Sequence, residues 1–188
     1  MRTPQKIEKY ISEIRLGHNK KSFTELSLGK TNKRDKWNRQ KLAYDYRMLV
    51  DSISADQRAH ALYIYDRVYF IEFTDFDLDV LNHGGLTLHD IPSLEVKIKN
   101  SFLDLKKTFM SPIGLDDHGF GNYFIIVIHD STSNPVGAMA NYHQNLANKT
   151  VEDSKRDYRE SMKKKYTMYR IIQFQYYSQF PKGISGLI

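Results

Sequence analysis

The stretch from Gly121 to Gln144 constrains the fold of this chain most, because signals for a strand, a turn and a second strand follow one another within it. Residues 123–128 are an unbroken run of apolar, aromatic and β-branched side chains of strand length. The polar residues 129–135 then predict a turn, and residues 136–142 a second strand. We therefore expect a central hairpin. Because its first strand is apolar on both faces, we expect a covering layer on each side of it.

Two further segments, one before and one after this hairpin, are rich in β-branched and aromatic residues. Together with the hairpin they predict an α+β fold, in which amphipathic helices flank a mostly antiparallel central sheet. The expected strands lie near residues 67–73, 122–129, 136–142 and 166–177.

Three segments have the apolar period of an amphipathic helix. The first covers residues 3–14, where Thr3 and Pro4 form a helix start and three isoleucines share one face. The second covers residues 33–53 and is basic. The third has the strongest period, and we expect Lys97 on its exposed side. Its apolar positions are Leu94, Ile98, Phe102, Leu105 and Phe109.

The length of 188 residues fits one domain, which we divide into a basic helical N-terminal extension (residues 1–60) and an α+β core (residues 61–188). The absence of cysteine excludes disulfides and thiolate metal sites. No apolar run is long enough to span a membrane, and the charged start does not read as an export signal. These features predict a cytoplasmic protein.

The net charge of +6 is concentrated between residues 20 and 47, a segment that contains nine basic and three acidic residues. Such a segment is typical of contact with nucleic acid or with an acidic protein, although a solvated helix face explains it equally well. Trp37, Tyr44 and Tyr46 lie among the basic residues, and interleaved aromatic side chains are typical of single-strand binding. The candidate contact residues are Lys33, Arg34, Lys36, Trp37, Arg39 and Lys41.

Three aspartates at alternate positions, Asp75, Asp77 and Asp79, suggest a metal site, but the glycine and glutamate of a calcium-binding loop are missing after them. Glu95-Val-Lys97 resembles half of the motif of the PD-(D/E)xK nucleases, where it lies on a strand. The helical period of this segment would point Glu95 and Lys97 away from each other. We expect no metal site, and a nuclease remains the second alternative.

The order of the expected elements resembles the N-terminal half of the GNAT acyltransferase superfamily, in a degenerate form. VYFIEFTDFDLDVLN is similar to the family's first strand and acidic turn, and YFIIVIHDSTSNPVGAMANY to its second and third strands. YRIIQFQYYSQFPKGISGLI is similar in outline to its phosphate-binding turn, although the glycine spacing differs. The resemblance implies acetyl-coenzyme A as cofactor, with His129 and Tyr123 on the catalytic side. The cofactor phosphates would lie at Lys182, Gly183, Ser185 and Gly186.

An acyltransferase-like domain is thus the first expectation. A non-enzymatic protein that binds nucleic acid or an acidic protein through residues 20–47 is the alternative.

Overall fold

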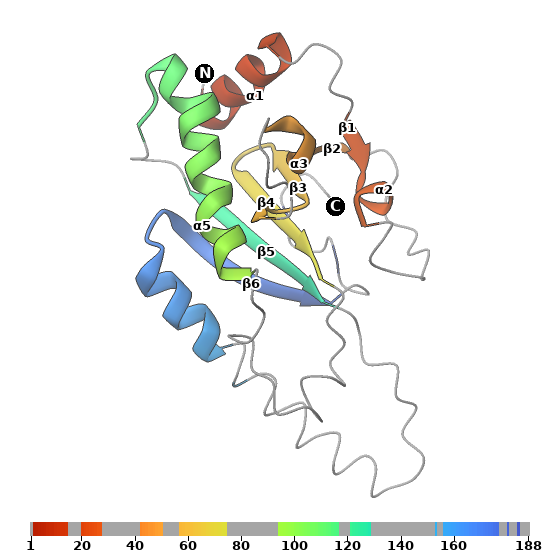
Figure 1. Ribbon diagram of the computed structural model, residues 1–188, viewed down its shortest axis with the longest axis vertical. Helices are drawn as coiled ribbons and strands as arrows, with labels where there is room; N and C mark the ends of the chain where they lie inside the picture. Colours follow the sequence, from red (N-terminus) through yellow and green to blue (C-terminus); the bar gives the residue numbers. More distant parts are fainter. Residues whose placement is uncertain are drawn as a thin grey trace, which may run out of the picture.

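The structure, a computed structural model, describes the chain in segments. The described residues are 2–14, 20–27, 42–50, 57–74, 94–116, 121–128, 153, 156–176, 180 and 184. In this part of the chain, helices pack around one six-stranded sheet (Figure 1). The α+β fold class expected from the sequence is confirmed.

The strands lie side by side in the order of the sequence. They are β1 (Lys20–Ser22), β2 (Leu42–Asp45), β3 (Ala61–Ile64), β4 (Val68–Phe73), β5 (Asn122–Ile128) and β6 (Tyr169–Tyr176). Neighbours from β1 to β4 are antiparallel, whereas β4, β5 and β6 run parallel to one another. The sheet is therefore mixed, and the expectation of a mostly antiparallel sheet is wrong. The strands predicted near residues 67–73 and 166–177 are confirmed as β4 and β6.

β5, the first strand of the predicted hairpin, has a parallel neighbour on each side. Tyr123 pairs with Tyr69 of β4 and with Ile171 of β6. Because both edges of β5 are occupied, the predicted hairpin is wrong; residues 136–142 themselves lie outside the described residues. A strand that is apolar on both faces is typical of the interior of a parallel sheet, where the chain crosses over between strands instead of turning back.

Two of the three predicted helices are confirmed. In α1 (Thr3–Ile14), Ile7 and Ile11 are buried, while Ile14 is exposed. All the apolar positions of the strongest predicted helix are buried. It forms α5 (Leu94–Leu105), followed by a π-helical turn, η3 (Lys106–Met110), and a 3-10 turn, η4 (Ser111–Ile113). Gly114 ends this run in the left-handed region, with φ at 67°.

The predicted basic helix over residues 33–53 is wrong where the structure describes it. Residues 42–45 form β2, and α3 (Tyr46–Leu49) is a single turn. β2 pairs with β1 on one side and with β3 on the other, so strand pairing overrides the helical spacing of its apolar residues. β1 and β2 therefore belong to the same sheet as β3, across the expected boundary at residue 60.

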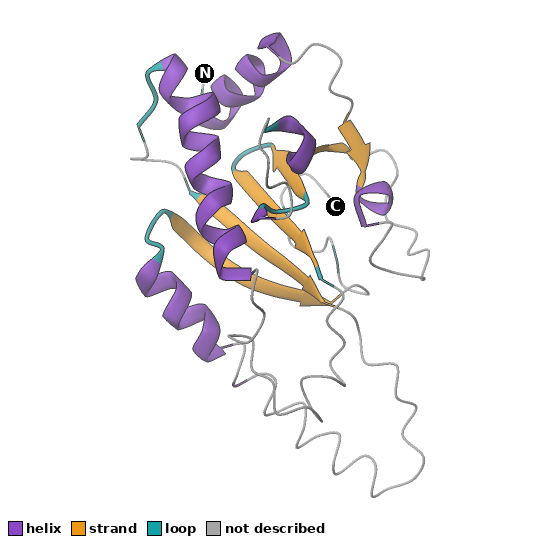
Figure 2. Ribbon diagram, viewed as in Figure 1, coloured by secondary structure: helices purple, strands orange, loops and turns teal. Residues whose placement is uncertain are grey.

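Both faces of the sheet are covered, as expected. On one face, Phe70 and Phe124 pack under α1, α5 and a helix at residues 156–165. Of these helices, α5 lies across the strands in Figure 2. On the other face, Phe73 packs against Phe180, and α2 (Phe23–Ser27) covers the neighbouring strands. Since successive side chains of a strand point to opposite faces, β4 and β5 supply both cores.

Candidate functional site

Most of the predicted site residues lie outside the described residues. They are His129; the cofactor residues Lys182, Gly183, Ser185 and Gly186; and the basic-segment residues Lys33, Arg34, Lys36, Trp37, Arg39 and Lys41. Asp75, Asp77 and Asp79 lie outside as well. Binding of acetyl-coenzyme A therefore stays a prediction.

Tyr123 is the predicted catalytic residue that the structure does describe. Its hydroxyl accepts a hydrogen bond from Arg67, whose guanidinium also lies 5.0 Å from the centre of the Tyr123 ring. Tyr123 and Ile128, the residue that precedes His129 in the sequence, lie at opposite ends of β5, roughly 17 Å apart at a strand's rise per residue. These contacts indicate that Tyr123 holds the side chain of Arg67 in place.

Glu95 and Lys97, the residues behind the nuclease alternative, lie on α5 and contact different partners. Glu95 forms an ion pair with Lys165 and accepts a hydrogen bond of 2.8 Å from Tyr166. Lys97 contacts Glu72 of β4 instead. No group of three metal-binding side chains occurs in the described part of the chain, so the described geometry offers no support for a nuclease.

A charged cluster is buried between α5 and the sheet. Glu72 lies 2.7 Å from Nδ1 of His60 and 2.6 Å from Nζ of Lys97. Because the Glu72 carboxylate can only accept hydrogen bonds, Nδ1 of His60 carries the proton and donates it. The backbone N–H of Phe73 lies 3.3 Å from the same Nδ1, but a protonated Nδ1 cannot accept a hydrogen bond from it. The side chains of His60 and Glu72 are 4% exposed and that of Lys97 11%. No substrate reaches this carboxylate while α5 is in place, so we assign the cluster to the fold.

A second group of polar and aromatic residues lies at one end of the sheet, which we call the turn end. The turn between β3 and β4, residues 65–67, is located there, because Ile64 pairs with Val68. The parallel strands β5 and β6 begin at the same end, since Val68 pairs with Asn122 and Asn122 with Tyr169. β2 begins there too, because it runs antiparallel to β3.

β2 and β3 pair over only two residues each, Tyr44 with Leu62 and Asp45 with Ala61. Beyond these pairs, toward the turn end, a hollow of about 330 Å³ lies along the two strands. The side chains that line it include Lys20, Leu42 and Tyr65. We call this hollow the fork.

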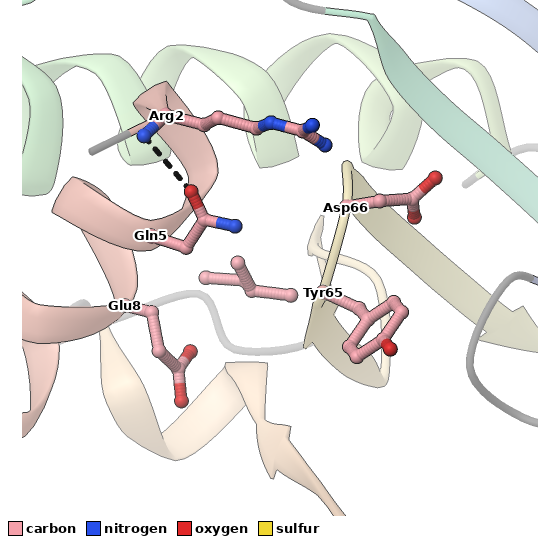
Figure 3. A pocket seen from close by; sticks show the side chains of 6 residues that line it. Arg2, Gln5, Glu8, Tyr65 and Asp66 are labelled. Atoms are coloured by element: carbon pink, nitrogen blue, oxygen red, sulfur yellow. Dashed lines mark hydrogen bonds between the residues drawn. The ribbon is translucent and has the colours of Figure 1, made fainter.

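A second hollow, of about 390 Å³, lies on the other side of Ile64 and Tyr65. Figure 3 shows Arg2 and Gln5 on one side of it, from the start of α1, and Tyr65 and Asp66 on the other, from the turn. The backbone N–H of Arg2 donates to Gln5 Oε1 at 2.9 Å. This hollow, which we call the Arg2 hollow, therefore offers amide, guanidinium and carboxylate groups next to an aromatic ring.

Tyr65, shared by both hollows, is 55% exposed. Its ring stacks on that of Tyr63, with centroids 6.5 Å apart and an angle of 15° between the planes. Tyr63 is itself packed against Phe23 and Tyr69, at 5.9 Å from each. The exposed ring is therefore the outer member of an aromatic cluster that reaches into the core, and the contact with Tyr63 supports one of its faces.

The wall of the fork also holds Tyr44, one of the aromatic residues noted among the basic ones. Its hydroxyl donates to Glu8 at 3.0 Å, and Lys20, which forms an ion pair with Glu8, lies 4.8 Å from the Tyr44 ring. Burial, and then the Glu8 carboxylate, raise the pKa of the Tyr44 phenol. Tyr46, in contrast, is fully buried and donates to the carbonyl of Ser101, so it serves packing.

The described parts of the basic segment (residues 20–47) belong to the sheet and to α2. Lys20 of β1 and Leu42 of β2 are part of the wall of the fork. The side chain of Leu42 is 42% exposed although apolar. Sequence reasoning found the basic segment and Tyr44, but it missed Tyr65 and Tyr63. Their spacing of two residues could have indicated two rings on the same face of a strand. The exposure of Tyr65, in contrast, depends on its place in the turn.

Comparison of the chain with models of known protein families, with characterised proteins and with solved structures gave no significant match. The described residues define an α+β protein with a mixed sheet. Among the helices in the described segments, none has the length and apolar character needed to cross a membrane.

Proposed function

We propose that the protein binds single-stranded nucleic acid at the turn end of its sheet. The observation that carries this proposal is the exposed ring of Tyr65, stacked on Tyr63 between two hollows, at the place where the basic segment rejoins the sheet.

An exposed aromatic ring that is supported on one face and lies at the mouth of a cavity is suited to stack on a flat ligand. Every nucleobase has such a face, and stacking on a protein aromatic contributes about 1–3 kcal/mol per base. Leu42 and Ile64 offer further apolar contact beside Tyr65. Bases in a duplex are already stacked on one another, so this surface favours a single strand.

The charge of the region supports the same ligand. Residues 20–47 hold the whole positive excess of the chain, and Lys20, Leu42 and Tyr44 of this segment line the fork. A phosphate backbone passing the fork would meet Lys20 in its wall, and release of its counterions would add to binding. An acidic protein would use the charges but would leave the aromatic platform without a role.

The test is fluorescence anisotropy with a labelled oligonucleotide, single-stranded or annealed to its complement. We expect binding at low salt to the single strand and weaker binding to the duplex. Tyr65→Ala should weaken binding by roughly 5- to 150-fold, the equivalent of about 1–3 kcal/mol. Tyr65→Phe should retain it, because the ring remains.

Leu103→Ala is the matched control, since Leu103 is 43% exposed but lies on α5. Its affinity should equal that of the parent chain. The proposal is overturned if no single strand binds at low salt, or if Tyr65→Ala binds as tightly as Leu103→Ala.

A further inference from the structure

We infer that Arg67 and Arg170 form a phosphate-binding site above Gly121, at the turn end of the sheet. That the phosphate belongs to a nucleic-acid strand rests on the proposed function, whereas the affinity of the site for a phosphate group does not. Neither arginine was singled out by the sequence, because their proximity depends on how β4, β5 and β6 pair.

Arg67 is held in place by an aromatic side chain. It donates a hydrogen bond to the hydroxyl of Tyr123, and its guanidinium lies 5.0 Å from the centre of that ring. Its Nε lies 3.5 Å from Asp66, in a pair about a third exposed on each side. These contacts orient the guanidinium group of Arg67. Because a planar guanidinium carries five N–H donors, some of them are left for a ligand.

Arg170 is placed by an irregularity in β6. Asn122 pairs with Tyr169, but Tyr123 pairs with Ile171, so Arg170 is an extra residue in the ladder. A bulge of this kind redirects a side chain and is frequent next to binding sites. Arg170 is exposed and forms no ion pair with any residue that the structure describes.

The two arginines converge on Gly121. A Cβ atom added to Gly121 would lie 3.1 Å from Cδ of Arg170 and 3.4 Å from Nη1 of Arg67. Both side chains therefore pass close to one point, and the absence of a side chain at Gly121 leaves room for them. Two guanidinium groups on side chains that meet at this point raise the local positive potential, which an anion bound by both would neutralise.

The charges around this point favour an anion. Asp66 is the acidic side chain in contact with Arg67, and it also accepts a hydrogen bond of 2.9 Å from Tyr69. Arg67 thus has a carboxylate partner, whereas Arg170 has no ion-pair partner among the described residues. Two planar guanidinium groups suit the tetrahedral oxygens of a phosphate, which accept paired N–H donors.

The site lies in line with the proposed stacking surface. Tyr65 and Arg67 are two residues apart in the same turn, so their Cα atoms are at most roughly 7 Å apart. A strand with one base on Tyr65 would pass Arg67 with a neighbouring phosphate. Tyr123, proposed from the sequence as catalytic, would then act as a positioning residue that holds Arg67.

The first experiment uses inorganic phosphate alone and so does not depend on the proposed function. In NMR titrations of the ¹⁵N-labelled chain, the backbone amides of Gly121 and Arg170 should shift in a saturable way. Arg170→Gln should abolish the shifts. Arg156→Gln, the matched control, should leave them intact, because Arg156 is an exposed arginine that pairs with Asp153 three residues earlier, in the helical region before β6. Shifts that do not saturate, or that persist in Arg170→Gln, overturn the site.

The second experiment assigns the phosphate. With a single-stranded oligonucleotide, Arg170→Gln should reduce the slope of log affinity against log salt by roughly 0.7, the value for one phosphate contact. Arg156→Gln should keep the full slope. If inorganic phosphate binds but no oligonucleotide does, the site stands and the proposed function fails. If the oligonucleotide binds with an unchanged slope in Arg170→Gln, the function stands and the assignment of the site to a nucleic-acid phosphate fails.

Discussion

Lys97 of α5 places its ammonium 2.6 Å from the carboxylate of Glu72, inside the space between helix and sheet. Glu72 is the one charged residue of β4, and it faces the same core as Phe70. His60 holds the other carboxylate oxygen at 2.7 Å. The pair therefore fixes where α5 sits on β4, because any shift of the helix would leave a buried charge without its partner.

Glu72→Leu should destabilise the fold strongly, by about 3–5 kcal/mol, because it leaves the Lys97 ammonium buried without its counter-charge. The double variant Glu72→Leu with Lys97→Met should recover most of this loss, since an apolar pair of similar volume needs no counter-charge. Urea unfolding of the parent chain, the single variant and the double variant measures both effects.

Lys165→Met is the matched control, because Lys165 forms its ion pair with Glu95 at the surface. It should change the free energy of unfolding little, as is usual for exposed pairs. A double variant as unstable as Glu72→Leu alone would contradict the anchoring role of the pair.

Lys97 also shows what the sequence could reveal of the fold. The period of residues 94–109 predicted α5 correctly, because that pattern lies within the helix itself. The same pattern wrongly placed Lys97 on the exposed side. The pattern within the helix cannot reveal its buried partner Glu72, which lies on a distant strand. β2 was missed for a similar reason: Leu42–Asp45 becomes a strand through its pairing with β1 and β3.

The candidate site was predictable only in part. The basic segment and Tyr44 are visible in the residue composition of the sequence, which can be read without knowing the fold. Tyr65 becomes a platform only because a tight turn exposes it and Tyr63 supports it. Arg170 becomes a candidate only through a shift in strand register, and register is a property of two strands together.

The basic segment should make binding sensitive to salt. For a single strand, log affinity falls by roughly 0.7 per phosphate contacted for each unit of log salt. Lys33→Glu with Arg34→Glu should therefore flatten this slope, and it should leave the melting temperature nearly unchanged. An anisotropy series across salt concentrations measures the slope, and calorimetry the melting temperature. A large loss of stability would instead show that these residues are packed.

The resemblance to acyltransferases predicts a different ligand. If the family's cofactor site is present, acetyl-coenzyme A should raise the melting temperature, because a ligand that binds only the folded state stabilises it, by about 2.7 kcal/mol at a hundred times its dissociation constant. Gly183→Asp should remove the effect by placing a carboxylate among the phosphates. Adenosine diphosphate is the matched control ligand. An unchanged melting temperature at millimolar acetyl-coenzyme A would remove the acyltransferase prediction.

Alkaline pH should weaken the fold through its buried tyrosines. Burial raises the pKa of Tyr63 to about 12, and it raises the pKa values of Tyr46 and Tyr169 well above the usual 10. Because these phenols are more acidic in the unfolded chain, the stability they contribute is fully present below about pH 10 and is lost as the pH rises toward 12. Urea unfolding should thus give a constant free energy from about pH 9 to 10 and a falling one above it. Tyr63→Phe should make the fall less steep. A free energy that is flat across this range would contradict the burial of these phenols.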